Sequence, residues 1–108
     1  MMNYEIIKRD WKLFKEKIAD WQEAYIDKVN KEYVEILLAK DTNPSDKFWT
    51  LDERIKKDKK KAGVQIEMTK SNLLFNLCLL INEGAINLTD LAEFTEDLKE
   101  AVKLCCRL

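Results

Sequence analysis

The sequence contains no histidine, the side chain that most often serves as a general base and as a zinc ligand. Glycine occurs twice and proline once in 108 residues. Turns that need a left-handed or fixed backbone must therefore be few, which favours long helices over many short strands. A glycine-rich phosphate loop and a Gly-x-Ser-x-Gly motif are also missing. We expect a helical protein that is not an enzyme and that needs no cofactor or metal.

The three cysteines lack the arrangement of a disulfide scaffold or of a metal site. They are Cys78, Cys105 and Cys106, an odd number with no Cys-x-x-Cys spacing. We therefore expect reduced thiols. The apolar spacing places Cys78 and Cys105 in the core. Cys106 lies about 100° further around its helix and should be more accessible.

A long apolar run and a secretory signal are missing as well. The most apolar stretch, residues 73–81, is nine residues long and is interrupted by Asn76. A membrane-spanning helix needs about 20 residues. The first residues carry neither the basic start nor the apolar segment of a signal peptide. We expect a cytoplasmic protein that does not act at a membrane.

What the chain does contain is typical of one globular domain. Hydrophobic residues make up 46% of the sequence and charged residues 36%, which is far from the composition of disordered chains. The net charge is -1, from 19 basic and 20 acidic side chains, so the overall charge indicates no partner. We expect a single helical domain over residues 1–108.

The first third of the chain predicts one long helix. No glycine or proline occurs between residues 4 and 39, and apolar residues recur at alternating spacings of four and three, which places them on one side of a helix. They are Ile7, Trp11, Phe14, Ile18, Trp21 and Tyr25. A break at Asp20 is an alternative, because Asp20 and Glu23 have the spacing of a capping box. The apolar spacing passes this point unchanged, so a continuous helix is the better interpretation.

A second helix should follow a turn. Asn43 can cap it and Pro44 suits its first position. It should end at Gly63, a residue suited to the left-handed conformation after a helix. The residues expected on its inner side are Phe48, Leu51, Ile55 and Ala62. Residues 64–68 alternate apolar and polar, but no second strand is predicted, so they should form an extended linker.

The third helix should be the buried centre of the domain. It can begin at Thr69 or Ser71 and should end at Gly84. Residues 73–81 are apolar nearly all round, and such a helix is covered on most sides. The side chains expected near zero accessibility are Leu74, Leu77, Cys78 and Ile81.

The last helical stretch covers residues 88–108. Thr89 and Thr95 are both possible caps, so a short turn over residues 90–93 can precede the main helix. Its apolar side should consist of Leu91, Phe94, Leu98, Ala101 or Val102, Cys105 and Leu108. The expected fold is all-α, an irregular four- to five-helix bundle with one long N-terminal helix and a central buried third helix.

Four aromatic residues are candidates for an interface. Trp11, Trp21 and Tyr25 follow the helical spacing of the first helix, which is more typical of a core than of a binding surface. Trp49 stands beside Phe48, off the expected inner side of its helix, so it should be partly exposed. A partly exposed tryptophan is a good interface anchor.

A cluster of positive charge, the basic run (residues 54–61), is the strongest charge feature. It contains Arg54, Lys56, Lys57, Lys59, Lys60 and Lys61. One interpretation is a contact for the phosphate backbone of nucleic acid or for an acidic protein surface. The other is a solvated helix end, because cations near a helix C-terminus are stabilising. The run lacks interleaved aromatic residues, which favours the second interpretation.

Several short segments resemble parts of small uncharacterised helical proteins of Gram-positive bacteria and their mobile elements. The segments are residues 11–14 (WKLF), 21–23 (WQE), 45–49 (SDKFW) and 90–94 (DLAEF). The resemblance would cover most of the chain and implies no activity, cofactor or site residue. It raises the expectation of an accessory protein of phage or plasmid origin.

The length of the first helix suggests self-association. At about 1.5 Å per residue, 35 residues span roughly 50 Å, and each later helix reaches only about half of that. Either two later helices lie end to end along it, or a second copy covers the excess, and a symmetric dimer is the commonest solution. We expect a non-enzymatic interaction or assembly module, a homodimer. The alternative function is an accessory protein that binds nucleic acid through the basic run.

Overall fold

The structure is a computed structural model that describes residues 4–106, and it is all-helical over that range. The α-helices are α1 (Tyr4–Leu38), α2 (Pro44–Asp58), α3 (Leu73–Asn82) and α4 (Glu96–Cys106). Two single turns of 3-10 helix, η1 (Lys70–Asn72) and η2 (Leu88–Leu91), precede α3 and α4. No strand occurs within residues 4–106, so the predicted all-α class is confirmed and residues 65–69 are an irregular linker.

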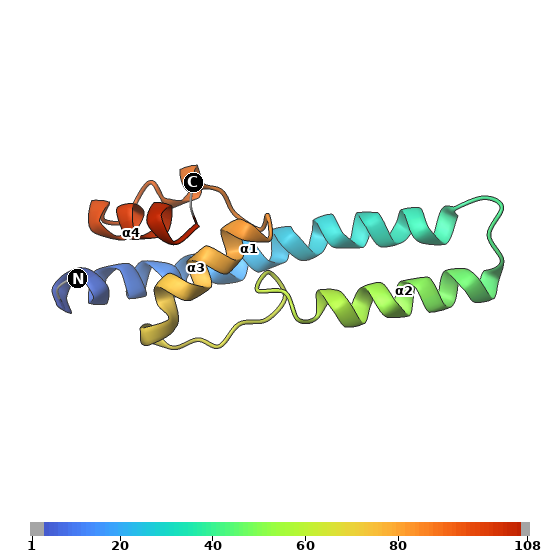
Figure 1. Ribbon diagram of the computed structural model, residues 1–108, viewed down its shortest axis with the longest axis horizontal. Helices are drawn as coiled ribbons and strands as arrows, with labels where there is room; N and C mark the ends of the chain where they lie inside the picture. Colours follow the sequence, from blue (N-terminus) through green and yellow to red (C-terminus); the bar gives the residue numbers. More distant parts are fainter. Residues whose placement is uncertain (1–3, 107–108) are drawn as a thin grey trace.

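The molecule is elongated, with extents of 56 × 24 × 18 Å, and α1 runs along most of its length (Figure 1). α2 returns antiparallel beside the C-terminal half of α1, while α3 and α4 pack at the N-terminal half. The fold therefore has a helical hairpin (residues 26–58) at one end and a compact end (residues 8–25 and 62–106) at the other. This arrangement differs from one bundle of similar helices running side by side.

α1 is continuous over 35 residues, as the unbroken apolar spacing predicted. Phe14, Ile18 and Val29 are buried along it, and Asp20 is exposed within the helix without a break. The side chain of Ile7 lies outside the described residues. Lys47 of α2 donates a hydrogen bond of 3.0 Å to the carbonyl oxygen of Leu37, which satisfies one carbonyl at the end of α1.

The apolar cluster of the core lies at the compact end, and the buried Val29 of the hairpin is outside it. Phe14 and Ile18 of α1 pack there against residues from α3, η2 and α4 and from the loops between them. The remaining buried members of this cluster are Ala62, Leu73, Leu77, Leu80, Ile86, Leu91, Phe94, Leu98 and Val102. Because α1 carries its core contacts only in this half, the core leaves the hairpin uncovered.

α3 is less completely buried than its composition predicted. Leu77 and Cys78 are buried as expected, but Leu74 and Ile81 are only partly covered. Phe75 is 60% exposed. In this fold α3 packs closely on α4 and contacts α1 through the core cluster, while Phe75 lies on the side that faces solvent. The prediction of near-zero accessibility was therefore wrong for Leu74 and Ile81, because fewer helices surround α3 than the prediction assumed.

α2 also departs from expectation. It ends at Asp58 rather than at Gly63, and turns follow. Phe48, expected on the inner side, is 62% exposed, whereas the polar Asp58 is buried. Gly63 has no left-handed backbone, unlike Gly84, whose φ of 79° fits the predicted end of α3. The reason for a glycine at position 63 is a close approach, since a Cβ atom there would overlap the ring of Tyr25.

Side-chain hydrogen bonds cap the starts of η2 and α4. The Asn87 side chain and the Asp90 side chain bond reciprocally to each other's backbone N–H groups, a capping box over η2. Thr95 caps α4 by accepting a hydrogen bond of 3.3 Å from the N–H of Leu98. The buried side of α4 contains Leu98 and Val102. Cys105 is consequently exposed and Cys106 half-buried, the reverse of the prediction, and Leu108 lies outside the described residues.

Candidate functional site

The aromatic residues of α1 are part of the edge of the core. The Trp11 ring stacks on Phe14 with centroids 6.0 Å apart, and Phe14 in turn meets Trp21 edge-on at 6.1 Å. Trp21 then stacks on Phe94 at 6.2 Å. Trp11 and Trp21 are both half-buried. Their main contacts are therefore internal, although each keeps part of its ring at the surface.

Tyr25 lies at the junction between the compact end and the hairpin. Its half-buried ring covers Gly63. Burial raises the pKa of Tyr25, with smaller contributions from the charges of Asp58 and Glu83. Glu83 also accepts a 2.7 Å hydrogen bond from the N–H of Ala62. Tyr25 of α1 therefore packs against the turns over residues 59–64, and the hydrogen bond between Ala62 and Glu83 joins these turns to the end of α3.

Trp49 is 61% exposed, in agreement with its position beside the inner side of α2. Its ring meets that of Phe48 edge-on, with centroids 5.0 Å apart. Both lie near the start of α2, next to the end of α1, where further large apolar side chains are exposed. We call this set the apolar tip: Val34 (51% exposed), Leu37 (48%), Leu38 (73%), Phe48 (62%) and Trp49 (61%).

Polar contacts hold the two helices of the hairpin together. The Tyr33 hydroxyl donates a 2.6 Å hydrogen bond to Asp58, and Arg54 lies 3.6 Å from the same carboxylate. Arg54 also lies 3.4 Å from Glu32 and over the ring of Tyr33. Burial, the hydrogen bond to Asp58 and the charge of that carboxylate together raise the pKa of Tyr33 to about 12. The sequence did not predict this polar network; of the residues that it placed on the inner side of α2, Leu51 and Ile55 are half-buried.

The basic run does not form a continuous cationic side of a helix. Arg54 turns toward α1, and Lys56 pairs with Asp52 at 2.9 Å. Because α2 ends at Asp58, three of the lysines follow the helix in turns rather than on it. The lysines that are exposed without a partner among the described side chains are Lys57, Lys59 and Lys60, and Lys61 is half-buried.

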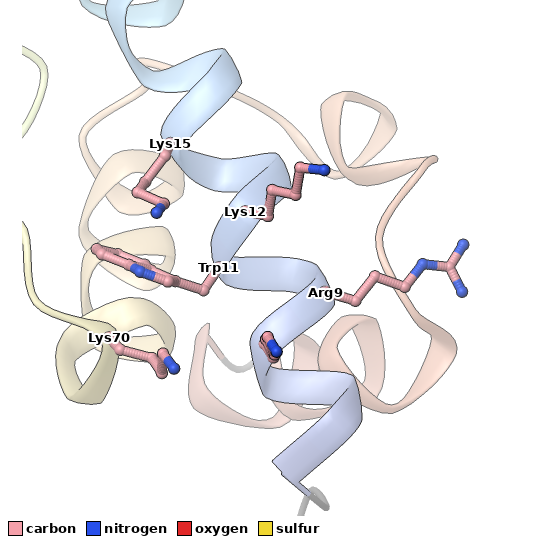
Figure 2. A pocket seen from close by; sticks show the side chains of 6 residues that line it. Arg9, Trp11, Lys12, Lys15 and Lys70 are labelled. Carbon is pink, nitrogen blue, oxygen red and sulfur yellow. The ribbon is translucent and has the colours of Figure 1, made fainter.

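Sequence reasoning missed a second basic surface, which we call the basic depression. It is an open hollow of about 560 Å³ at the compact end, lined by Lys8, Arg9, Trp11, Lys12, Lys15 and Lys70 (Figure 2). The α1 residues recur at helical spacing, which was the available signal. Asp10, which lies within the same stretch, obscured this signal. Lys70 is too far from residues 8–15 in the sequence to be associated with them.

The three cysteines are all free thiols, and they differ in burial. Cys106 lies 3.8 Å from the carbonyl oxygen of the buried Cys78, and burial raises the pKa of the Cys78 thiol. A raised pKa opposes the thiolate form that nucleophilic chemistry requires. Among the side chains that the structure describes, no group of three or more potential ligands could hold a metal ion.

Comparison of the chain with protein-family models, with curated proteins and with solved structures finds no match. In the part of the chain from residue 4 to residue 106, no helix has both the length and the apolar character needed to cross a bilayer.

Proposed function

We propose that this chain is a non-enzymatic protein–protein interaction module that self-associates through the apolar tip of its hairpin. An accessory protein of a phage or another mobile element would fit such an assembly role. The observation that carries the proposal is the gathering of five large, half- to three-quarters-exposed apolar side chains around one end of the molecule. Single exposed apolar residues are ordinary, whereas clusters of this kind mark interaction sites.

The arrangement of these residues favours contact with another helical hairpin. Val34 and Leu38 are one turn apart on α1, and Trp49 lies on the side of α2 away from the inward-facing Lys47. Leu37 follows the half-buried Ile36 on α1, and Phe48 follows the inward-facing Lys47 on α2. Because the two helices are right-handed and antiparallel, we expect Leu37 and Phe48 to point to the same side of the hairpin. A second hairpin laid on that side would complete four-helix packing.

The exposed area is compatible with a second copy as the partner. From the usual area of such side chains, the apolar tip leaves roughly 500 Å² exposed. Two copies would bury at most roughly 1,000 Å² from these side chains, because only Leu37 and Phe48 point to the shared side, and this is below the range of about 1,200–2,000 Å² typical of stable interfaces. Contacts along the flanks of the two hairpins would add to this buried area, so we expect a dimer of micromolar affinity.

Molar mass measured by light scattering over a concentration series tests the proposal. We expect the parent protein to change from monomer to dimer in the micromolar range. Phe48→Lys and Leu38→Lys place a charge in the interface and should weaken dimerisation at least tenfold, or about 1.4 kcal/mol.

Two matched variants at the compact end are the controls. Phe75→Lys changes a phenylalanine of similar exposure, 60%, and Leu104→Lys changes a leucine that is 81% exposed. Neither should alter the dimerisation constant. A parent protein that stays monomeric near millimolar concentration, or controls that weaken association as strongly as the tip variants, would contradict the proposal.

A further inference from the structure

The basic depression concentrates positive charge in a protein whose net charge is -1. Five of the six residues that line it are cationic and the sixth is Trp11, so no carboxylate belongs to its lining. Four of the cations come from two turns of α1, and Lys70 comes from η1. Such a surface attracts anions because the like charges reinforce one another.

The α1 cations of the depression are not committed to ion pairs with the described side chains. The pairs that the structure contains involve other lysines and Arg54, whereas Lys8, Arg9, Lys12 and Lys15 have no carboxylate within ion-pair distance in the described part of the chain. The one acidic residue between positions 8 and 15, Asp10, is fully buried and bonded to Thr95. The helix thus separates its charges, with the carboxylate inside and the cations outside.

Trp11 adds an aromatic surface to this charge. Its half-buried ring extends from α1 between Lys15 and Lys70, whereas Arg9 and Lys12 point to the other side of the helix (Figure 2). The Lys15 ammonium lies 5.5 Å from the ring centroid. A lysine side chain is flexible, so a flat ligand could take that place over the ring while Lys15 turns toward an anionic group.

The neighbouring surface limits the direction that a ligand can take. The next hollow toward α4 contains Glu16 and Glu93 beside Arg9 and Lys12. An anionic chain is therefore repelled on that flank and favoured on the flank of Trp11 and Lys70. From residue 8 to residue 15 the helix rises about 10 Å. A stretch this short can contact only about two or three phosphates of a strand.

We propose that the basic depression binds single-stranded nucleic acid, with lining cations such as Lys8 and Lys15 on two or three phosphates and a base stacked on Trp11. Cations that follow the backbone together with an aromatic stacking surface are what single-strand binding requires. An acidic protein segment would use the cations but would leave the ring of Trp11 unused. This proposal is independent of the proposed function, because the apolar tip lies at the opposite end of the molecule.

Fluorescence anisotropy with a labelled single-stranded oligothymidine tests the assignment. We expect a dissociation constant between about 1 and 100 µM at physiological salt, as for other non-specific complexes. For two or three phosphate contacts, the log–log salt dependence should have a slope of about -1.4 to -2.1. The triple variant Lys8→Gln, Lys12→Gln, Lys15→Gln should weaken binding at least tenfold and flatten this slope.

The basic run supplies a control with the same change in charge. Lys57→Gln, Lys59→Gln, Lys60→Gln also neutralises three exposed lysines and should leave the affinity within twofold of the parent. Trp11→Leu should weaken binding roughly tenfold through the loss of stacking without changing the salt slope, and Trp11→Phe should restore most of it. Circular dichroism of each variant verifies that it is folded.

Several outcomes would overturn the proposal. They are no binding by the parent protein at low salt, an equal loss in the basic-run control, no effect of a folded Trp11→Leu variant, and equal competition by polyglutamate of the same length. The last would identify the depression as a site for acidic protein segments. Competition by a mononucleotide at concentrations similar to those of the oligonucleotide would instead assign it to a single nucleotide.

Discussion

Asp10 and Thr95, 85 positions apart in the sequence, join the start of α1 to the start of α4. The fully buried carboxylate of Asp10 accepts a 3.0 Å hydrogen bond from the Thr95 N–H and a 2.6 Å hydrogen bond from its hydroxyl. Thr95 itself caps α4. A carboxylate at this position also faces the positive end of the α4 dipole, which is stabilising.

Replacing Asp10 should therefore destabilise the fold strongly. Asp10→Ala leaves two partly buried donors of Thr95 without an acceptor, and we expect a loss of about 2–4 kcal/mol in the free energy of unfolding. Urea denaturation followed by circular dichroism measures it. Asp20→Ala, an exposed change on the same helix, should stay within about 0.5 kcal/mol of the parent. Equal stability of the two variants would show that the Asp10 contact is not formed.

Gly63→Ala should be destabilising because of Tyr25 rather than because of the backbone. The added methyl group would overlap the Tyr25 ring, and we expect a loss of about 1–3 kcal/mol. In a Tyr25→Ala background the same change should have little effect, which a double-mutant cycle of unfolding free energies would reveal. Gly84→Ala meets no neighbouring atom but has a left-handed backbone, so its smaller loss should not depend on Tyr25.

Alkaline pH should loosen the hairpin through Tyr33. The pKa of Tyr33 is about 12 in the fold, against about 10 for an unperturbed tyrosine, so its contribution to stability is complete below about pH 10. That contribution is lost as the pH rises from about 10 toward 12. Thermal unfolding measured across this range should show a steeper fall for the parent protein than for Tyr33→Phe. Parallel pH profiles would contradict the contact with Asp58.

The three thiols should react in the order of their exposure. We expect an alkylating reagent to modify the exposed Cys105 first, the half-buried Cys106 more slowly and the buried Cys78 only after unfolding. Mass spectrometry of timed samples gives the order. Faster labelling of Cys106 than of Cys105 would support the original sequence prediction and would contradict the orientation of α4 in the structure.

Local signals in the sequence predicted the fold class and its longest element. The continuity of α1 and the left-handed Gly84 depend on neighbouring residues alone, so spacing and composition were sufficient. The inner side of α2 was predicted only in part, because its contact with α1 includes polar side chains: Leu51 and Ile55 are half-buried, but Phe48 is exposed. Apolar spacing cannot reveal that Asp58 is inside and Phe48 outside.

The candidate surfaces were less predictable, because each depends on residues brought together by the fold. The exposure of Trp49 follows from its place on α2, but the apolar tip also requires Leu38 to lie beside the start of that helix. The basic depression requires Lys70 near α1 and Asp10 turned inward. In α4, Val102 rather than Ala101 is buried. The buried side of the helix therefore continues to Cys106 instead of Cys105, which exchanges the expected environments of the two cysteines.

The uneven distribution of the core has a consequence for how the chain opens in solution. Between residues 26 and 58 only Val29 and Asp58 are buried, whereas the compact end contains the whole apolar cluster. Segments with few buried contacts open with less free energy than the molecule as a whole. Amide protons along α1 should therefore exchange progressively faster from Phe14 toward Leu38. A partner that covers the apolar tip would slow that exchange, so association and local folding of the hairpin become one equilibrium.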